Sequence, residues 1–187
     1  PDKGGAVVWH NKVGRGGFLG GVHWGMSANG DSLFVPIADT TITGRFTGPV
    51  SPGIHALDPT SGEVRWYTPS VADCDGKSPI PVCDQGMSAA ITSTDQLVFA
   101  GSLDGNLNVY DSLSGEILWS FDTFGDFESV SGDTALGGSI ESDGPVLYKG
   151  YVLINSGYQF GARMPGNALM VFSLPPQANL ARSARDE

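Results

Sequence analysis

The chain has 187 residues, of which 40% are hydrophobic, and a formal net charge of −10 at neutral pH. This length corresponds to one large domain or two small ones with enough apolar side chains to build a core. The acidic balance argues against charge-driven binding to nucleic acid or to an anionic membrane, and the longest apolar runs fall far short of the roughly 20 residues of a membrane helix. We therefore expect no nucleic-acid partner and no membrane span.

The first predicted element is a short strand over residues 6–9, Ala-Val-Val-Trp, which has the sequence of the end of a repeat. The chain begins at Pro1 without a starting Met, so we expect that a leader or an upstream region was removed or is not included. Residues 14–21 are rich in glycine, but they neither open a predicted helix nor follow the G-x-G-x-x-G spacing of a phosphate loop. We interpret them as a flexible connection.

Two inner segments with similar sequences follow. Gly-Met-Ser-Ala occurs at residues 25–28 and again at residues 86–89, and each copy precedes a short apolar strand, at residues 31–35 and 95–99. A weaker third copy begins at residue 138 and includes an apolar strand over residues 151–154. Turn signals separate these segments, which are rich in β-branched and aromatic residues, and no long helical period is present. The pattern predicts an all-β fold built from repeats.

The clearest repeat is a blade ending in which Gly62 precedes Trp66 and Gly115 precedes Trp119 by the same interval. An Asp lies four residues before each glycine, where its carboxylate can accept backbone N–H groups of a tight turn. With Trp9 the tryptophans recur about every 50 residues, a period that suits the four-stranded blade of a β-propeller. We assign these tryptophans to interblade packing, and Asp58 and Asp111 to turns.

Two cysteines, Cys74 and Cys83, lie in a proline-containing loop between the first two complete repeats. The loop has no C-x-x-C spacing and no nearby histidine, so it lacks the ligands of a zinc site. We expect a disulfide in preference to two free thiols, which favours an oxidising compartment.

The last repeat breaks off after residues 169–173, where Ser173 replaces the turn Asp and two prolines follow in place of the glycine and tryptophan. Residues 1–176 are therefore predicted to hold one orphan outer strand, two full blades and a three-stranded blade, followed by a polar tail over residues 177–187. About three blades cannot close a ring, because closed propellers have roughly four to eight. We expect the remaining blades on an upstream segment or on a companion chain.

With these blade endings, residues 20–28 (Gly-Gly-Val-His-Trp-Gly-Met-Ser-Ala) and 97–107 resemble the quinoprotein alcohol dehydrogenases, in particular the branch similar to polyvinyl-alcohol dehydrogenase. The resemblance covers residues 6–174 and implies the C-terminal part of an eight-bladed propeller with tryptophan-docking repeats. It also implies pyrroloquinoline quinone (PQQ) as cofactor with Ca²⁺ beside it, a cytochrome c as electron acceptor, and a periplasmic or secreted location. The catalytic base and the metal ligands of the family belong to earlier blades, so we assign none of them here.

The resemblance implies four cofactor-binding residues. His23 and Trp24 stand where many members of the family have Asn-Trp at the central pocket, so Trp24 could face the planar quinone and His23 could bond its oxygens. Gln85 and Gly86 are predicted to occupy the same place one blade later. Trp24 could equally serve only in packing, and an envelope scaffold propeller that binds partner proteins without a cofactor uses the same repeat. That scaffold is the alternative function.

Overall fold

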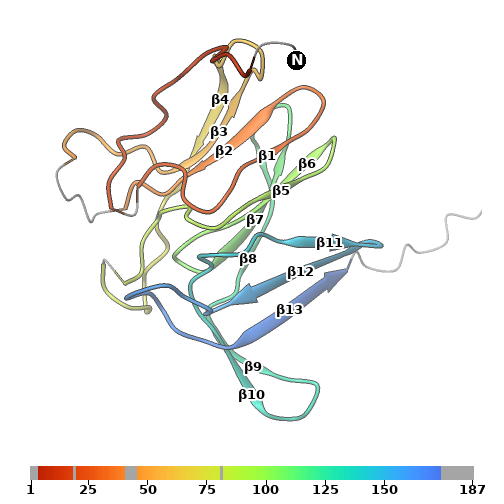
Figure 1. Ribbon diagram of the computed structural model, residues 1–187. Helices are drawn as coiled ribbons and strands as arrows, with labels where there is room; N and C mark the ends of the chain where they lie inside the picture. Colours follow the sequence, from red (N-terminus) through yellow and green to blue (C-terminus); the bar gives the residue numbers. More distant parts are fainter. Residues whose placement is uncertain (1–3, 19, 41–45, 81, 174–187) are drawn as a thin grey trace, which may run out of the picture.

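The computed structural model describes residues 4–18, 20–40, 46–80 and 82–173, and all its regular structure is β-sheet (Figure 1). Two sheets have four strands each, one has three, and a separate hairpin has two. The first sheet contains β1 (Ser27–Ala28), β2 (Leu33–Ile37), β3 (Gly53–Leu57) and β4 (Val64–Pro69). The second sheet contains β5 (Thr92–Ser93), β6 (Leu97–Gly101), β7 (Asn106–Asp111) and β8 (Ile117–Asp122).

The third sheet contains β11 (Val146–Tyr148), β12 (Tyr151–Ser156) and β13 (Ala168–Ser173), and the hairpin contains β9 (Gly125–Glu128) and β10 (Thr134–Gly137). Every pairing is antiparallel and joins neighbours in sequence. The all-β prediction is confirmed, and the structure has sheets of four, four and three strands. Residues 6–9 pair with no strand in the part of the chain that the structure describes. The number of blades in a complete ring stays a prediction.

The sheets are held together by apolar cores between neighbouring layers. One core joins the first and second sheets through buried side chains that include Phe34, Ile54 and Val98. Another joins the second and third sheets through Leu107 and Ile154. The period-2 alternation of strands lets each sheet present apolar side chains to its neighbour, so burial in these cores stabilises the stack of sheets.

Tryptophan packing on glycine connects successive layers at their outer ends. Gly62 has a φ of +76° and Gly115 a φ of +74°, both in the left-handed region that favours glycine. A Cβ atom at Gly62 would lie 2.5 Å from the ring of Trp9, and a Cβ atom at Gly115 would lie 2.5 Å from the ring of Trp66. The absence of a side chain therefore allows each ring to lie flat on the next turn, and the packing role predicted for these two tryptophans is confirmed.

A hydrogen bond fixes each docked ring in the same way. The indole Nε1 of Trp9 donates to the Pro59 carbonyl oxygen at 3.0 Å, and that of Trp66 donates to the Ser112 carbonyl oxygen at 3.1 Å. Each acceptor directly follows the turn aspartate of its sheet. Trp9 thus occupies the position of a last-strand tryptophan, although residues 6–9 belong to no sheet of the described chain.

The turn aspartates act as predicted. The Oδ1 atom of Asp58 accepts the backbone N–H of Ser61 at 3.0 Å, and the Oδ1 atom of Asp111 accepts that of Ser114 at 2.8 Å. The Ser114 N–H and hydroxyl hold the pKa of the Asp111 carboxyl below its ordinary value. These carboxylates stabilise turns, which confirms their assignment to structure.

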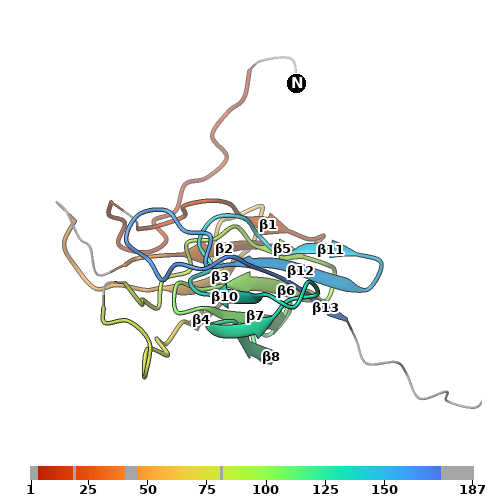
Figure 2. The ribbon, with the colours of Figure 1, turned by 90° about the horizontal axis from the view of Figure 1, so that it is seen from below.

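The two ends of the sheets differ. Alternate connections of an antiparallel meander lie at opposite ends, so one end carries the tight turns 29–32, 94–96 and 149–150. The other, which we call the loop end, carries the longer connections, among them 70–91 and 157–167; Figures 1 and 2 show it on the left. Functional residues of a β scaffold concentrate on such loops, so this end is where a binding site is expected. No helix long and apolar enough to cross a bilayer occurs among the described residues.

The tryptophan–glycine contact predicts the effect of a minimal substitution. Gly115→Ala is expected to lower the free energy of unfolding by about 2–4 kcal/mol, because alanine is strained at positive φ and its Cβ displaces the Trp66 ring. Thermal and urea unfolding followed by tryptophan fluorescence measure this loss. Gly132→Ala is the matched control, since Gly132 has a φ of +85° and no atom within 4 Å of a built Cβ. Equal losses in the two variants would contradict a specific role for the ring contact.

Candidate functional site

Three successive inner segments meet at the loop end and carry a cluster of polar side chains. The Trp24 N–H donates to the Ser88 carbonyl oxygen at 3.3 Å, and the Ala90 N–H donates to the Ser142 carbonyl oxygen at 3.0 Å. These two bonds join the segment before β1 to that before β5, and the segment before β5 to that before β11. The same segments contribute His23, Ser88 and Glu141, so three sheets build the site.

His23 and Trp24 form its exposed part. The Nδ1 atom of His23 lies 2.7 Å from the hydroxyl oxygen of Ser88, and the His23 and Trp24 rings lie 5.1 Å apart at 47°. Trp24 is 47% exposed, which leaves much of a large flat ring open to a ligand.

A buried ion pair adjoins this exposed pair. Arg163 Nε lies 3.9 Å from Glu141 Oε1, and both side chains are almost completely buried. The other carboxylate oxygen of Glu141 accepts the Phe160 N–H at 2.6 Å. Burial raises the pKa of Glu141 above its ordinary value, against the opposing effects of the Phe160 N–H, Arg163 and His23.

Asp39 fixes the glycine-rich segment that leads to His23. Its carboxylate is buried and accepts backbone N–H groups of Arg15 at 2.6 Å, Gly16 at 3.0 Å and Gly21 at 3.2 Å, as well as that of Ser51 at 3.0 Å. Burial raises the pKa of Asp39, but the four N–H donors outweigh it and hold the pKa below its ordinary value. A carboxylate of the chain itself thus satisfies the backbone N–H groups of this segment. Hydrogen bonds therefore hold Arg15, Gly16 and Gly21 in place, where the sequence predicted a flexible connection.

Gln85 does not occupy the position predicted for it. The Ala90 N–H bonds to the segment before β11 in the same way as the Trp24 N–H bonds to the segment before β5. Ala90 therefore corresponds to Trp24, and Gln85 lies five residues before Ala90. The predicted alignment of residues 86–89 with residues 25–28 is therefore wrong. The two Gly-Met-Ser-Ala segments lie at different distances from their strands. Residues 25 and 26 lead directly into β1, whereas several residues separate Ser88 from β5.

Gly86 is buried where the first and second sheets meet. A Cβ atom there would lie 2.6 Å from the Ala38 carbonyl oxygen. Its N–H donates to Asp84 Oδ1 at 2.9 Å, and its carbonyl oxygen accepts the Leu103 N–H at 3.0 Å. These contacts fix the backbone that carries Ser88 two residues later.

A disulfide stabilises the connection that leads to Ser88. Cys74 and Cys83 are bonded, with 5.9 Å between their Cα atoms, and no free cysteine occurs in the described chain. The predicted disulfide is confirmed. It closes a short loop at the loop end and limits the freedom of the residues that follow.

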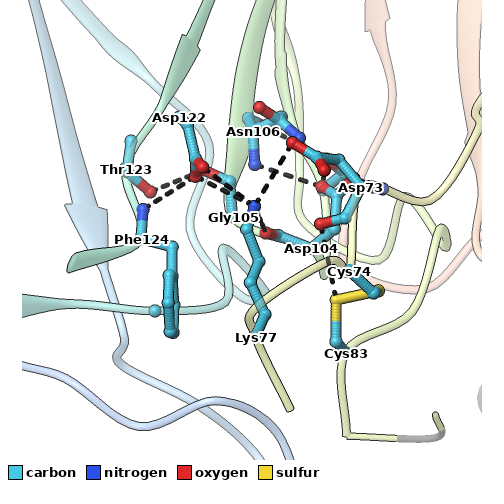
Figure 3. A network of polar contacts seen from close by, with 12 residues as sticks. Asp73, Cys74, Lys77, Cys83, Asp104, Gly105, Asn106, Asp122, Thr123 and Phe124 are labelled. Atoms are coloured by element: carbon cyan, nitrogen blue, oxygen red, sulfur yellow. Dashed lines mark hydrogen bonds and ion pairs between the residues drawn. A yellow bond between two sulfur atoms is a disulfide. The ribbon is translucent and has the colours of Figure 1, made fainter. Parts of the chain in front are cut away.

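Lys77 anchors the same loop to the second sheet (Figure 3). Its side chain is 4% exposed, and Nζ lies 2.8 Å from the Asp104 carbonyl oxygen and 3.0 Å from Asp122 Oδ2. The Asp104 carboxylate accepts the Asp73 N–H at 3.0 Å and the Ser102 hydroxyl at 2.5 Å. Asp104 thus accepts hydrogen bonds within the turn between β6 and β7, and it also holds the disulfide loop.

Glu141 and Arg163 were not identified from the sequence. Glu141 directly follows the third weak copy of the inner segment, and that repeat position was the available signal. Arg163 lies in the connection between β12 and β13, where nothing in the sequence distinguishes it from a solvated arginine. In the described ranges, no group of three or more His, Cys, Asp or Glu side chains could hold a metal ion.

Known proteins share the repeat of this chain. A family model of PQQ-type repeats, PQQ_2, described as outer membrane protein assembly factor BamB, matches residues 2–158. The chain belongs to this family. A polyvinylalcohol dehydrogenase of Pseudomonas sp. is 32% identical over 184 residues, which are 93% of this chain and 28% of that protein. The predicted resemblance to the quinoprotein alcohol dehydrogenases is confirmed.

Two further proteins are similar to this PQQ-repeat chain. The 1-butanol dehydrogenase (cytochrome c) of Thauera butanivorans is 33% identical over 112 residues, 59% of this chain and 15% of that protein. The structure of a europium-containing methanol dehydrogenase aligns with 85% of this chain and 26% of its own, with 18% identity and a TM-score of 0.49. The chain spans less than a third of the length of the curated relatives it matches.

The described residues fit one side of a planar, anionic quinone. Trp24 offers an exposed ring for stacking, and the exposed His23 offers a ring nitrogen to an oxygen atom. The buried Glu141 carboxylate is paired with Arg163 and, because an ionised carboxylate only accepts hydrogen bonds, it offers none to an anionic oxygen. Aromatic faces bind flat conjugated rings, and imidazole bonds carbonyl or carboxylate oxygens.

Glu141 predicts a pH dependence of stability in this PQQ-repeat chain. Burial raises the folded-state pKa of Glu141 above its ordinary value of 4.5. The contribution of Glu141 to the free energy of unfolding is therefore fully present below pH 4.5 and is lost as the pH rises through the folded-state pKa. Glu141→Gln is expected to flatten this decline in the free energy of unfolding, measured by urea titration at a series of pH values. Glu128→Gln, on the exposed hairpin, is the control and should keep the wild-type slope. The same slope in Glu141→Gln would contradict the assignment.

Proposed function

We propose that the chain forms the C-terminal part of a PQQ-dependent alcohol dehydrogenase and supplies one wall of its cofactor pocket. The observation that carries this proposal is the exposed His23–Trp24 pair, which three sheets hold beside a buried Glu141–Arg163 ion pair. The 32% identity to a polyvinylalcohol dehydrogenase over almost the whole chain supports the same reaction class, oxidation of an alcohol.

In this proposal each site residue has a separate task. The Trp24 ring stacks on one face of the quinone and excludes water from it. His23 uses Nδ1 for the Ser88 hydroxyl, so Nε2 is the ring atom that meets a cofactor oxygen. Gly86 helps to set the position of Ser88, because its N–H and its carbonyl oxygen both make hydrogen bonds in the connection that leads to Ser88.

The cofactor itself supplies the redox chemistry, because a bound PQQ accepts a hydride from the alcohol at a quinone carbonyl. The residues of this chain orient that group and tune its surroundings. We assign the base that removes the alcohol proton, and the Ca²⁺ ligands, to the remaining blades on an upstream segment or companion chain. A cytochrome c as electron acceptor and a periplasmic or secreted location complete the proposal, and the disulfide agrees with an oxidising compartment.

A scaffold propeller of the bacterial envelope is the second candidate. The family description as an outer membrane assembly factor favours it, since such a protein would bind partners through its loops without a cofactor. The exposed Trp24 ring would then contact a protein. The two candidates differ in one measurable property, the uptake of quinone.

The deciding experiment measures intact mass and absorption on the native protein with whatever segment or chain co-purifies. We expect a larger assembly that binds PQQ in the presence of Ca²⁺ and oxidises alcohols in a dye-linked assay. In that assembly, Trp24→Ala is expected to weaken quinone binding tenfold or more, about 1.4 kcal/mol, because the stacking surface is lost. Trp24→Phe should restore most of the affinity.

A histidine pair controls for general effects of substitution. His23→Gln should weaken quinone binding, whereas His10→Gln should leave it unchanged because His10 is exposed and lies in the segment before the glycine-rich loop. An assembly that remains without chromophore after PQQ and Ca²⁺ are supplied would reject the dehydrogenase and favour the scaffold.

A further inference from the structure

The turn between β1 and β2 contains the one Asn-Gly pair of the sequence, Asn29–Gly30. The other asparagines are followed by Lys, Leu, Val, Ser or Ala, each of which carries a Cβ atom. A backbone nitrogen can attack the side-chain amide of the preceding asparagine, and a side chain on the attacking residue hinders this reaction. Glycine has no side chain and reaches the required backbone conformation most readily. Asn29 is therefore the asparagine of this chain at which that reaction is least hindered.

Hydrogen bonds hold the Asn29 side chain over its own turn. Its Oδ1 atom accepts the backbone N–H groups of Asp31 at 3.0 Å and Ser32 at 2.8 Å. The Asp31 bond closes a ring that includes the Asn29 Cγ atom and the backbone nitrogen of Gly30, as in other turns of this kind. The two donors also withdraw electron density from the side-chain carbonyl, which favours nucleophilic attack on Cγ.

The backbone nitrogen of Gly30 is available for this attack. Its N–H donates no hydrogen bond to the described part of the chain, whereas the neighbouring N–H groups of Asn29 and Asp31 are both bonded. Gly30 is exposed, and a Cβ atom built on it has no other atom within 4 Å. The base that removes the N–H proton, and the water that completes the reaction, can therefore reach the site.

The side-chain amide of Asn29 joins the first sheet to the second. Its Nδ2 atom donates to the Asp95 carbonyl oxygen, in the tight turn of the second sheet, at 3.1 Å. A further bond between these sheets runs from Ser93 Oγ to the Ala28 carbonyl oxygen at 3.2 Å. A carboxylate only accepts hydrogen bonds, so at position 29 it would place an oxygen atom against the Asp95 carbonyl oxygen. Conversion of Asn29 would remove one bond between the sheets and replace it with a repulsive contact.

We propose that Asn29 is a site of spontaneous deamidation, and that its conversion loosens the first and second sheets at the tight-turn end. The Gly30 nitrogen loses its proton and forms a bond to Asn29 Cγ, and the side-chain amide nitrogen leaves as ammonia, which gives a cyclic imide. Water then opens the imide at one of its two carbonyls and leaves aspartate or isoaspartate. The sum of the steps consumes one water and releases one ammonia, without oxidation or reduction. In isoaspartate the main chain runs through Cβ, so the added atom also disturbs the pairing of β1 with β2.

The test follows the complete 187-residue chain during incubation at mildly alkaline pH, because base removes the proton of the attacking nitrogen. Peptide mapping by mass spectrometry measures deamidation at each asparagine and identifies isoaspartate. We expect Asn29 to react about tenfold faster or more than Asn11 and Asn167, which are also exposed but precede residues with a side chain. A rate at Asn29 equal to theirs, or slower, would overturn the proposal.

Gly30→Ala is the matched control for the chemistry. Open space surrounds the new Cβ atom, and the φ of Gly30 lies outside the left-handed region, so this variant should begin with the stability of the wild type. It should deamidate at Asn29 about tenfold more slowly or less, because the Cβ atom hinders the attack.

Thermal unfolding during the same incubation tests the structural consequence. The wild type should lose stability in step with the conversion of Asn29, the Gly30→Ala variant should lose little, and Asn29→Asp should show the loss from the start. Equal losses in the wild type and Gly30→Ala, or an Asn29→Asp variant as stable as the wild type, would overturn the proposal. Quinone takes no part in these measurements, so their outcome is independent of the proposed function.

Discussion

The contact of a tryptophan face with a glycine turn is the constraint on which the rest of the structure depends. It occurs at Trp9 with Gly62 and at Trp66 with Gly115, and in each case an indole N–H bond to the turn fixes the ring. Apolar cores alone would let neighbouring sheets slide or rotate, since hydrophobic burial has no direction. The docked ring removes that freedom and brings three inner segments into register at the loop end.

Most of the scaffold could be predicted because its residues act locally. Asp58, Gly62 and Trp66 sit at fixed intervals, and each interval corresponds to one turn or strand. The disulfide between Cys74 and Cys83 was predictable for the same reason, since it lies within a single loop. The predicted alignment of the inner strands was wrong because that loop is longer than its counterpart, and a residue pattern does not reveal how much chain precedes a strand.

The candidate site was predictable only in part, because its members meet through the tertiary fold. His23 and Trp24 form a recognisable sequence motif. Their neighbours come from other sheets and from an irregular connection, and they are Ser88, Glu141 and Arg163. The glycine-rich loop illustrates the same limit. Its glycine content predicted a flexible connection. The carboxylate of Asp39, which is distant in sequence, instead holds it in place through hydrogen bonds. Such contacts join residues that no sequence interval relates.

Each sheet contacts only its immediate neighbours, and this nearest-neighbour arrangement has an evolutionary consequence. A repeat with its own turn, glycine and tryptophan carries both halves of the interface, so duplication or loss of one genetic unit creates no new kind of contact. The loop end can then diverge freely, because the docking surfaces lie at the outer, tight-turn end. Related propellers can thus acquire different binding sites, or lose a cofactor altogether, while the tryptophan–glycine contacts at the same few positions are retained.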